Sequence, residues 1–344
     1  MRVLVAMSGG VDSSMAAALL RDAGHHVVGA TLKLWGGASD SGCCSVADVE
    51  DARRVAQQLG LAHHVFNFTE DFEARVVGPY AAAHAAGRTP NPCIECNRHL
   101  KFDRLLDRAV RLGFDAVATG HHARVGGGAG RWELRRGVDA AKDQSYVLAV
   151  LGQAQLSRLL LPVGELTKAE VRARAAALGL RTAAKPDSQD VCFVARTGGR
   201  RAFLAPRIPL HPGRVVDAAT GRPVGTVPAV ELVTVGQRRG LGAADGVRRY
   251  AVSVDVASAT VVAGTAADAC ADRVAFEAAS LSWVDGPVAA GTEVLAQASA
   301  HGRPAAAVYE SDGLRWAEPQ RRVAPGQTVA LYDGDRVLGA ATAA

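Results

Sequence analysis

The segment Ser8-Gly9-Gly10-Val11-Asp12-Ser13-Ser14 has the residue types that bind an anion. It follows an apolar run over residues 2–7 and precedes a helical pattern over 13–23. Two glycines let the backbone approach a ligand closely, and the free N–H groups at a helix N-terminus attract negative charge. The segment lacks the Gly-Lys-Ser/Thr of a Walker loop and the third glycine of a dinucleotide fingerprint. It therefore predicts a different phosphate-binding loop, the alternative being a tight turn with capping serines.

This pattern resembles the PP-loop of the N-type ATP pyrophosphatases. Those enzymes cleave ATP between its α- and β-phosphates and usually adenylate an oxygen of a second substrate. The resemblance implies that the loop holds ATP.

A second candidate segment, residues 87–98, carries Cys93 and Cys96. Its two prolines disfavour helix, so we expect a stiff loop followed by a helix that begins at Cys96. A thiol at a helix N-terminus beside Arg98 and Lys101 is expected to have a lowered pKa and to act as a nucleophile. The alternative is a zinc half-site, which would need two more ligands.

The third candidate segment is Lys185-Pro186-Asp187-Ser188-Gln189-Asp190-Val191-Cys192-Phe193. It is polar and rich in turn-forming residues, with basic neighbours. A lone cysteine such as Cys192 is more often buried and inert than reactive. The sequence around Cys192 does not by itself choose between these two states.

Strands and helices alternate in the first part of the chain. Strands are expected over 2–7, 26–34, 65–68 and 115–119, and helices over 13–23, 46–59, 69–86 and 96–112. A capping box at Thr167-Lys168-Ala169-Glu170 predicts a further helix to about residue 178. Such alternation indicates an α/β domain with a parallel sheet covered on both faces. After Pro206 short β-runs replace it, over 214–217, 224–227, 250–255 and 260–263.

Charge is distributed unevenly along the 344 residues. Residues 101–250 carry 25 Lys and Arg against 13 Asp and Glu, whereas the flanking parts are net acidic. A basic middle suggests contact with a polyanion such as nucleic acid, and compositional drift is the alternative. No apolar stretch is long enough for a membrane helix and no signal peptide is recognisable, so we expect a cytoplasmic protein with reduced thiols.

Taken together, the motifs resemble those of the MnmA-type tRNA-specific 2-thiouridylases over almost the whole chain. The matching segments are the PP-loop, Thr31-Leu32-Lys33-Leu34-Trp35, Thr89-Pro90-Asn91-Pro92 with Cys96-Asn97, Gly120-His121-His122, Lys142-Asp143-Gln144-Ser145-Tyr146, Asp187-Ser188-Gln189 with Cys192-Phe193, residues 235–242, and Pro325-Gly326-Gln327. The PP-loop with two cysteine segments in this order is highly specific.

The resemblance implies a role for particular residues. Cys96 matches the nucleophile, and Cys192 matches the cysteine that bears a persulfide. The ATP-binding positions are Ala6, Met7, Ser8, Gly9, Gly10, Val11, Asp12, Ser13, Leu32 and Gly120. The positions around the target base are Asn91, Pro92 and Cys93, and other tRNA-contacting positions are His121, Lys142, Asp143, Gln144, Arg303 and Gln327.

The resemblance also implies three domains and a reaction. The domains are a PP-loop catalytic domain over 1–205, a small β domain over 206–269 and a C-terminal β-barrel over 270–344. The expected reaction is ATP- and Mg²⁺-dependent thiolation of the wobble uridine of tRNA at C2. A persulfide donor protein supplies the sulfur, and the enzyme acts as a monomer without a membrane.

Two departures from the family pattern leave the assignment open in places. Cys93 stands where some members have an aspartate, so an iron–sulfur cluster on Cys93, Cys96 and Cys192 is a minority alternative. Pro304 after Arg303 replaces a tyrosine of the family. Another PP-loop adenylating or amidating activity is also compatible with the motifs, and so is a zinc-stabilised RNA-binding module without catalysis. Cys43 and Cys44 have no assignable role, and Cys270 is expected to be structural.

Overall fold

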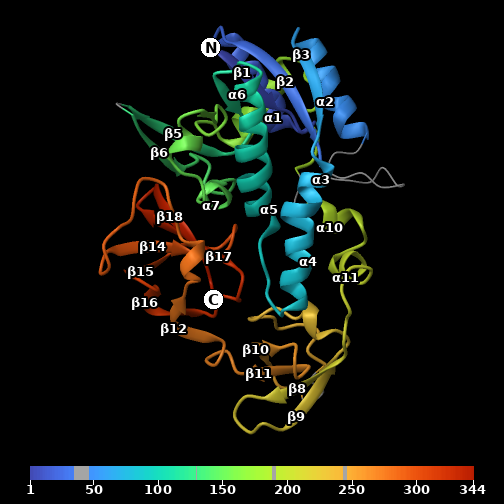
Figure 1. Cartoon of the computed structure of the whole chain (residues 1–344), viewed down its shortest axis with the longest axis vertical. Coiled ribbons are helices and arrows are strands. Elements are labelled where there is room, and N and C mark those ends of the chain that lie inside the picture. Colours follow the sequence, from blue (N-terminus) through green and yellow to red (C-terminus); the bar gives the residue numbers. More distant parts are fainter. Residues whose placement is uncertain (35–45, 129, 188–190, 243–245) are drawn as a thin grey trace.

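The computed structural model describes residues 1–34, 46–128, 130–187, 191–242 and 246–344. Figure 1 shows an N-terminal α/β part at one end, a middle β domain at the other and a C-terminal β domain beside both. Some residues of the sequence motifs lie outside the described residues. They are Trp35, Cys43, Cys44, Ser188, Gln189 and Asp190.

A five-stranded parallel sheet forms the centre of the N-terminal part. Its order is β3-β2-β1-β4-β7, from Ala62–Asn67, His26–Lys33, Arg2–Ala6, Ala116–Ala118 and Leu159–Leu160. Val3, Leu4 and Val5 of β1 are fully buried, as the apolar run predicted. The chain leaves β1 for β2 on one side and returns as β4 on the other. Ligands in open α/β sheets bind where the strand order reverses in this way, outside the carboxyl ends of the strands.

The hydrophobic periodicity of the sequence predicted most of the helices that cover this sheet. They are α1 (Val11–Asp22), α2 (Val46–Gln58), α3 (Thr69–Phe72) continuing through η1 (Glu73–Val77) into α4 (Gly78–Ala85), and α9 (Lys168–Ala177). Short helices complete the set: α7 (Ser145–Leu148), α8 (Gln153–Leu156), α10 (Cys192–Arg196) and α11 (Arg200–Leu204). The capping box of α9 forms as expected, with the Thr167 side chain accepting from the Glu170 backbone N–H.

The expected helix start at Cys96 was wrong. Helix begins four residues earlier, at Pro92, as α5 (Pro92–Glu95), and continues through η2 (Cys96–Arg104) into α6 (Leu105–Arg111). Pro92 occupies the first helical position, where its missing N–H costs no hydrogen bond. Asn91 caps this helix, because its Oδ1 accepts from the Cys93 backbone N–H at 3.0 Å. Cys96 therefore lies inside a continuous helical segment.

Two β domains follow the α/β part. The middle one contains a four-stranded sheet of order β10-β11-β8-β9, from Tyr250–Asp255, Thr260–Gly264, Gly213–Asp217 and Pro223–Val227, with the 3₁₀ turn η3 (Val230–Leu232). The C-terminal sheet contains β12 (Cys270–Ala275), β13 (Ser282–Trp283), β14 (Glu293–Gln297), β15 (Ala305–Glu310), β16 (Gly313–Arg321), β17 (Thr328–Asp333) and β18 (Arg336–Thr342), with η4 (Ala278–Ser280).

A hairpin that the sequence patterns did not predict joins the C-terminal sheet. It consists of β5 (Ala123–Gly128) and β6 (Arg131–Arg136), and β6 pairs with β18 through Arg135 and Arg336. The hairpin follows the Gly120-His121-His122 segment directly. It therefore connects the α/β part to the C-terminal domain close to the predicted nucleotide loop.

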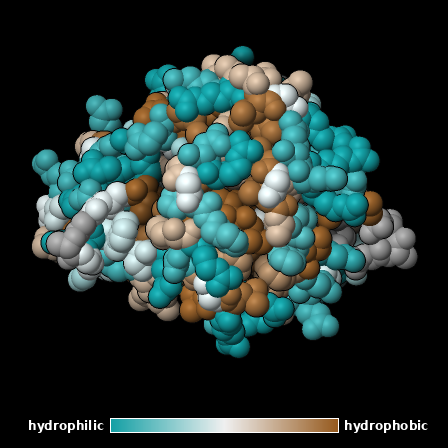
Figure 2. Space-filling view, turned by 90° about the horizontal axis from the view of Figure 1, so that it is seen from above, coloured by the Kyte–Doolittle hydropathy of each residue, from teal (hydrophilic) through white to brown (hydrophobic). Residues whose placement is uncertain are grey.

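The surface around the parallel-sheet end is mainly hydrophilic, with hydrophobic residues reaching it in separate patches (Figure 2). Scattered exposed apolar residues are normal for a folded domain and need no partner. Within the described part of the chain, no helix combines the length and apolarity that a membrane span requires.

Candidate active site

The predicted nucleotide loop lies between β1 and α1, at the point where the strand order reverses. Gly9 has φ = +75°, and a Cβ there would lie 2.2 Å from the Asp48 carbonyl oxygen. Only glycine fits this combination of conformation and space. The Ser13 hydroxyl donates to the Gly10 carbonyl at 3.1 Å and accepts from the Ser8 backbone N–H at 3.2 Å. These bonds fix the loop over the first turn of α1.

The segment after β4 packs against this loop. A Cβ on Gly120 would lie 2.5 Å from the Ser13 backbone nitrogen, so glycine is required for the close approach. His122 Nε2 lies 3.1 Å from Asp12 Oδ1. Leu32 is buried at the carboxyl end of the neighbouring strand β2. The loop, Leu32 and Gly120 therefore lie together at one edge of the sheet.

Asp12, in the first turn of α1, is contacted by side chains from two distant segments. Lys168 Nζ, from the first residue of α9, donates to both of its carboxylate oxygens at 2.7 Å. Burial alone would raise the pKa of Asp12, but hydrogen bonding with His122 and Lys168 outweighs it and lowers that pKa below its usual value. Asp12 is therefore ionised at neutral pH.

The segment leading to Cys192 is bound to the loop on two sides. Lys185 Nζ donates to the Gly9 carbonyl at 2.9 Å and to the carboxylates of Asp48 and Asp51. Asp187 accepts from Lys168 at 2.9 Å, and Lys168 in turn binds Asp12. Lys168, Lys185, Asp187 and His122 stand within motifs of the sequence, but the motifs alone predicted no role for these four residues.

Cys93 and Cys96 lie together in helix α5 and at the start of η2. Burial raises the pKa of both thiols, and the charge of Lys101 offsets this only in part. The expected lowering of the Cys96 pKa was therefore wrong for this structure. Its reason is physical: Cys96 lies within a helix instead of at its N-terminus and packs against a hydrophobic cluster that includes Phe72 and Phe193.

Cys192, the first residue of α10, packs against the same cluster as Cys96. Cys192 is disulfide-bonded, whereas Cys93, Cys96 and Cys270 are free thiols. A Cys96–Cys192 bond is thus not formed here. Among the described residues, no group of three or more His, Cys, Asp or Glu side chains could hold a metal ion.

The raised pKa has a measurable consequence for Cys96. We expect iodoacetamide to alkylate Cys96 more slowly at pH 7.5 than it alkylates glutathione, because less of the buried thiol is ionised. Tandem mass spectrometry of the tryptic peptide 89–98 separates Cys96 from Cys93. Faster alkylation of Cys96 than of glutathione would show that its thiolate is stabilised after all.

The residues predicted to contact tRNA differ in exposure: one is exposed, and the others make contacts within the protein. Arg303 is exposed in the segment before β15. The others make contacts within the protein. Gln327 Nε2 donates to the Thr89 carbonyl at 2.7 Å, and Gln144 accepts from the His122 backbone N–H. Lys142 binds Asp187, and Asp143 binds Arg136 and Ser145. His121 is buried, and Thr119 Oγ1 lies 2.7 Å from its Nδ1.

The Gln327 contact connects the C-terminal domain to the segment before Cys93. A second bond in the same place runs from the Thr89 backbone N–H to the Pro325 carbonyl at 2.8 Å. A Cβ on Gly326 would lie 3.3 Å from the Thr89 backbone nitrogen. The Pro325-Gly326-Gln327 motif therefore holds the loop that leads to Asn91 and Pro92.

Comparison with known proteins identifies the family. Three domain models match: "tRNA methyl transferase HUP domain" over residues 1–196, "tRNA methyl transferase PRC-barrel domain" over 201–265 and "Aminomethyltransferase beta-barrel domain" over 274–343. The tRNA-specific 2-thiouridylase MnmA of Chloroflexus aurantiacus is 48% identical over 98% of this chain and 96% of its own length. That of Beutenbergia cavernae is 49% identical over 100% and 95%. The chain belongs to the MnmA family.

Family membership confirms the resemblance and the fold class: a HUP-type parallel sheet followed by two β domains. Among solved structures, the U34-tRNA thiolase NcsA of Methanococcus maripaludis, with its [4Fe-4S] cluster, is 18% identical over 58% of this chain and 63% of its own, with a TM-score of 0.38. A likeness of that level does not transfer the cluster to this member of the MnmA family.

Proposed function

We propose that the protein is a tRNA 2-thiouridylase that adenylates the C2 oxygen of the wobble uridine and then replaces that oxygen with sulfur. One observation carries the proposal: the segment that leads to Cys192 is bound to the nucleotide loop through Lys185 and Gly9 and through Asp187 and Lys168. The loop has the residues to bind ATP for activation, and the segment bound to the loop carries the cysteine that would deliver sulfur. Membership of the MnmA family supports the same assignment.

Activation comes first, because C2 of uridine has no good leaving group. The oxygen at C2 attacks the α-phosphate of ATP, and pyrophosphate leaves. The N-terminus of α1, at Gly10 and Val11, offers N–H groups to the phosphates. Lys168 and Lys185 add positive charge at the loop. These residues bind and orient the phosphates for in-line displacement.

Mg²⁺ fits this site through Asp12. Magnesium in such sites is usually held by one or two carboxylates together with substrate phosphates and water, so a cage of three protein ligands is not required. Asp12 is an ionised carboxylate in the loop itself. The ion would neutralise charge on the phosphates.

Sulfur transfer follows. A donor protein converts Cys192 into a persulfide after its disulfide has been reduced. The terminal sulfur attacks C2, and AMP leaves with the former C2 oxygen. Cys96 then attacks the inner sulfur of Cys192, which releases 2-thiouridine and forms a Cys96–Cys192 disulfide, or Cys96 assists the displacement directly. In the first branch an external thiol later reduces the disulfide.

The base must leave the anticodon stack to reach this site. We propose that Asn91, Pro92 and Cys93 line its pocket, because Asn91 caps the helix that carries both thiols. His121, Lys142, Asp143, Gln144, Arg303 and Gln327 are proposed as further tRNA-contacting or supporting positions. We expect the reaction to take place in the cytoplasm with a monomeric enzyme.

Product analysis tests the activation step. Incubated with ATP, Mg²⁺ and unmodified tRNA, the protein is expected to release AMP and pyrophosphate, and omission of tRNA should greatly reduce this release. Release of ADP and orthophosphate would contradict a PP-loop activity. Equal release with and without tRNA would contradict tRNA as the adenylated substrate.

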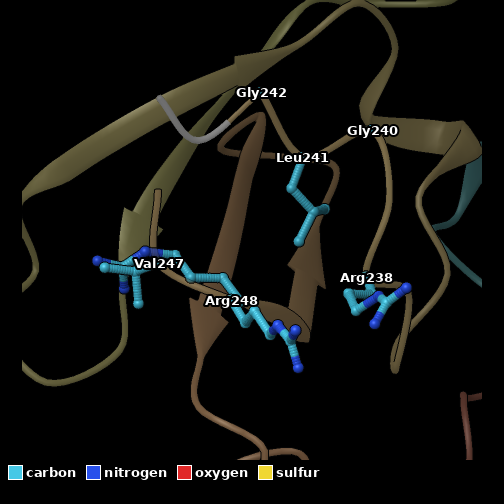
Figure 3. A pocket seen from close by; sticks show the side chains of 7 residues that line it. Arg238, Gly240, Leu241, Gly242, Val247 and Arg248 are labelled. Atoms are coloured by element: carbon cyan, nitrogen blue, oxygen red, sulfur yellow. The ribbon is translucent and has the colours of Figure 1, made fainter. Parts of the chain in front are cut away.

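A basic hollow in the middle domain offers a further contact for the RNA backbone. The hollow has a volume of about 360 Å³ and is lined by Arg238, Gly240, Leu241, Gly242, Val247, Arg248 and Arg249. Figure 3 shows Arg238 and Arg248 reaching it from two segments of the chain. Both side chains belong to exposed residues in the basic part of the sequence.

The double variant Arg238→Ala/Arg248→Ala is expected to bind tRNA more weakly, with a shallower salt dependence. Each lost phosphate contact lowers the slope of log K against log salt by about 0.9 for a duplex. Filter binding across a range of KCl concentrations measures the slope. The control is Arg53→Ala/Arg54→Ala, which removes two exposed arginines of α2. Identical slopes for the native protein and the Arg238/Arg248 variant would contradict this contact.

A further inference from the structure

Two cysteines stand three positions apart in the helical segment that begins at Pro92. Cys93 is the second residue of α5, and Cys96 is the first residue of η2. Both are free thiols, and neither residue is fully buried. Residues three apart on a helix are neighbours on its surface, with Cβ atoms about 5–6 Å apart. The proposed reaction uses the Cys96 thiol and leaves the neighbouring Cys93 thiol without a chemical role.

The charge of Lys101 acts on both thiols. Lys101 stands five positions after Cys96 in η2, a π-helix, in which backbone hydrogen bonds join residues five apart. Burial raises the pKa of Cys93 and of Cys96, and the Lys101 ammonium lowers each pKa in part. No ion pair between described residues involves Lys101, so no carboxylate in that part of the chain neutralises its charge. The Lys101 ammonium therefore favours the thiolate of either cysteine.

Both thiols lie beside the aromatic packing that carries Cys192. Burial raises the pKa of Tyr80, and the negative charge of a Cys93 thiolate adds to that rise, so Cys93 lies near Tyr80. The Tyr80 ring packs edge-on against Phe193, with 5.6 Å between the ring centroids. Phe193 is the residue after Cys192, and Cys96 and Cys192 pack against one hydrophobic cluster that contains Phe193. Cys93 is therefore close to the place where Cys96 and Cys192 would react.

We propose that Cys93 is a resolving thiol, which opens the Cys96–Cys192 disulfide left at the end of a turnover. The inference rests on the proposed function, in the branch that forms this disulfide. The Cys93 thiol loses its proton and attacks Sγ of Cys96, a Cys93–Cys96 bond forms, and Cys192 leaves as a thiolate that takes up a proton. Cys93 is oxidised and Cys192 is reduced, so the exchange needs no other reactant. Cys192 can then accept sulfur again.

The position of Cys93 suits both this exchange and its reversal. Groups held side by side react at effective concentrations far above that of a free thiol, which compensates for a small thiolate fraction. A disulfide needs Cβ atoms about 3.5–4.5 Å apart, closer than helix neighbours stand. The Cys93–Cys96 bond would therefore be strained, and strained disulfides are readily reduced. An external dithiol then reduces this bond and completes the cycle.

Mass spectrometry of the tryptic peptide 89–98 tests the proposal, because a Cys93–Cys96 disulfide makes this peptide lighter by two hydrogen atoms. Reduced protein is separated from reductant, loaded by a persulfide donor, and given unmodified tRNA, ATP and Mg²⁺ for one turnover. Native protein is expected to show the disulfide within peptide 89–98 and a free Cys192 thiol. Cys93→Ser is expected to form as much 2-thiouridine in that turnover and to retain the Cys96–Cys192 disulfide.

Repeated turnover gives a second readout. At a low dithiothreitol concentration, Cys93→Ser is expected to slow at least about tenfold after the first turnover, because a free thiol lacks the effective concentration of a neighbouring one. Excess dithiothreitol should restore its rate, since the reagent then reduces the Cys96–Cys192 disulfide directly. Cys270→Ser is the matched control, because it also removes a free thiol, at the start of β12. The control should match native protein in both experiments.

The possible results separate this inference from the proposed function. Native protein that forms 2-thiouridine and accumulates the Cys96–Cys192 disulfide, with none within peptide 89–98, would overturn the resolving role of Cys93. Formation of 2-thiouridine without any protein disulfide would overturn it as well. Native protein that forms no 2-thiouridine would overturn the proposed function, and with it the disulfide that Cys93 is proposed to resolve.

Discussion

Cys192→Ser is expected to abolish 2-thiouridine formation while AMP and pyrophosphate are still released. A serine hydroxyl cannot hold a transferable persulfide, whereas activation of the base needs only the nucleotide loop. Cys192 opens α10 and lies beyond the two contacts that bind its segment to that loop. Nucleoside mass spectrometry measures the thiolation, and chromatography of the labelled nucleotides measures the activation.

Two other cysteine variants test the role of the second thiol and provide a control. Cys96→Ser should also abolish thiolation and keep AMP release. Cys270→Ser is the control. Cys270 is the first residue of β12 in the C-terminal sheet, and its thiol donates to the Ala266 carbonyl. Peptide mass spectrometry after incubation with a persulfide donor should find the added sulfur on Cys192. Sulfur found only on Cys96 would reverse the two roles.

The variant Cys93→Ser distinguishes the persulfide route from a mechanism that uses an iron–sulfur cluster. The persulfide route predicts that Cys93→Ser retains activity and that the aerobic protein is colourless and free of iron. Activity that requires Cys93 and follows a brown iron–sulfur chromophore would support the cluster instead.

Asp12→Asn is expected to reduce pyrophosphate release by at least about 100-fold, the scale on which loss of one preorganised electrostatic group acts. The substitution keeps the shape of the side chain but removes the charge that binds Lys168 and His122. It also removes the one carboxylate of the loop that fits Mg²⁺. A pyrophosphate assay at saturating tRNA measures the loss, and circular dichroism checks that the fold is retained.

Asp22→Asn is the matched control for this variant. Asp22 ends the same helix, α1, and its exposed carboxylate pairs only with the neighbouring Arg21 among the described contacts. An exposed pair of this kind contributes little to stability. The control should release pyrophosphate at the native rate. Native activity in Asp12→Asn would remove Asp12 from the nucleotide site.

Local patterns predicted the part of the site that is local in the chain. The apolar strand, the glycines and the serines at residues 2–14 are consecutive, and each residue constrains its neighbours. The sequence therefore placed the loop between β1 and α1 correctly. Gly120 and Leu32 came from the resemblance, and the structure brings both to the same edge of the sheet.

The ion network could not be predicted, because its members are far apart in the sequence. The capping box placed Lys168 at the start of a helix, but nothing near it indicated a partner 156 residues away. The hairpin of β5 and β6 was missed for a similar reason. Its partner strand, β18, begins 200 residues after Arg136. Tertiary pairing decides both features.

The thiol of Cys96 shows how tertiary burial overrides a local expectation. Neighbouring Arg98 and Lys101 suggested a lowered pKa, and the prolines suggested a helix start at Cys96. In the folded chain the helix starts at Pro92, and desolvation against a hydrophobic cluster raises the pKa of the thiol. The proposed attack by Cys96 therefore requires a base or a change in conformation that increases the thiolate fraction.

Nucleoside mass spectrometry of tRNA tests the central claim most directly. Reduced, purified protein is incubated with unmodified tRNA, ATP, Mg²⁺ and a persulfide source, and the tRNA is then digested. The proposed function predicts 2-thiouridine at the wobble position, formed in equal amount with AMP and only when ATP and the persulfide source are both present. A digest without 2-thiouridine, from protein that binds both ATP and tRNA, would contradict the claim.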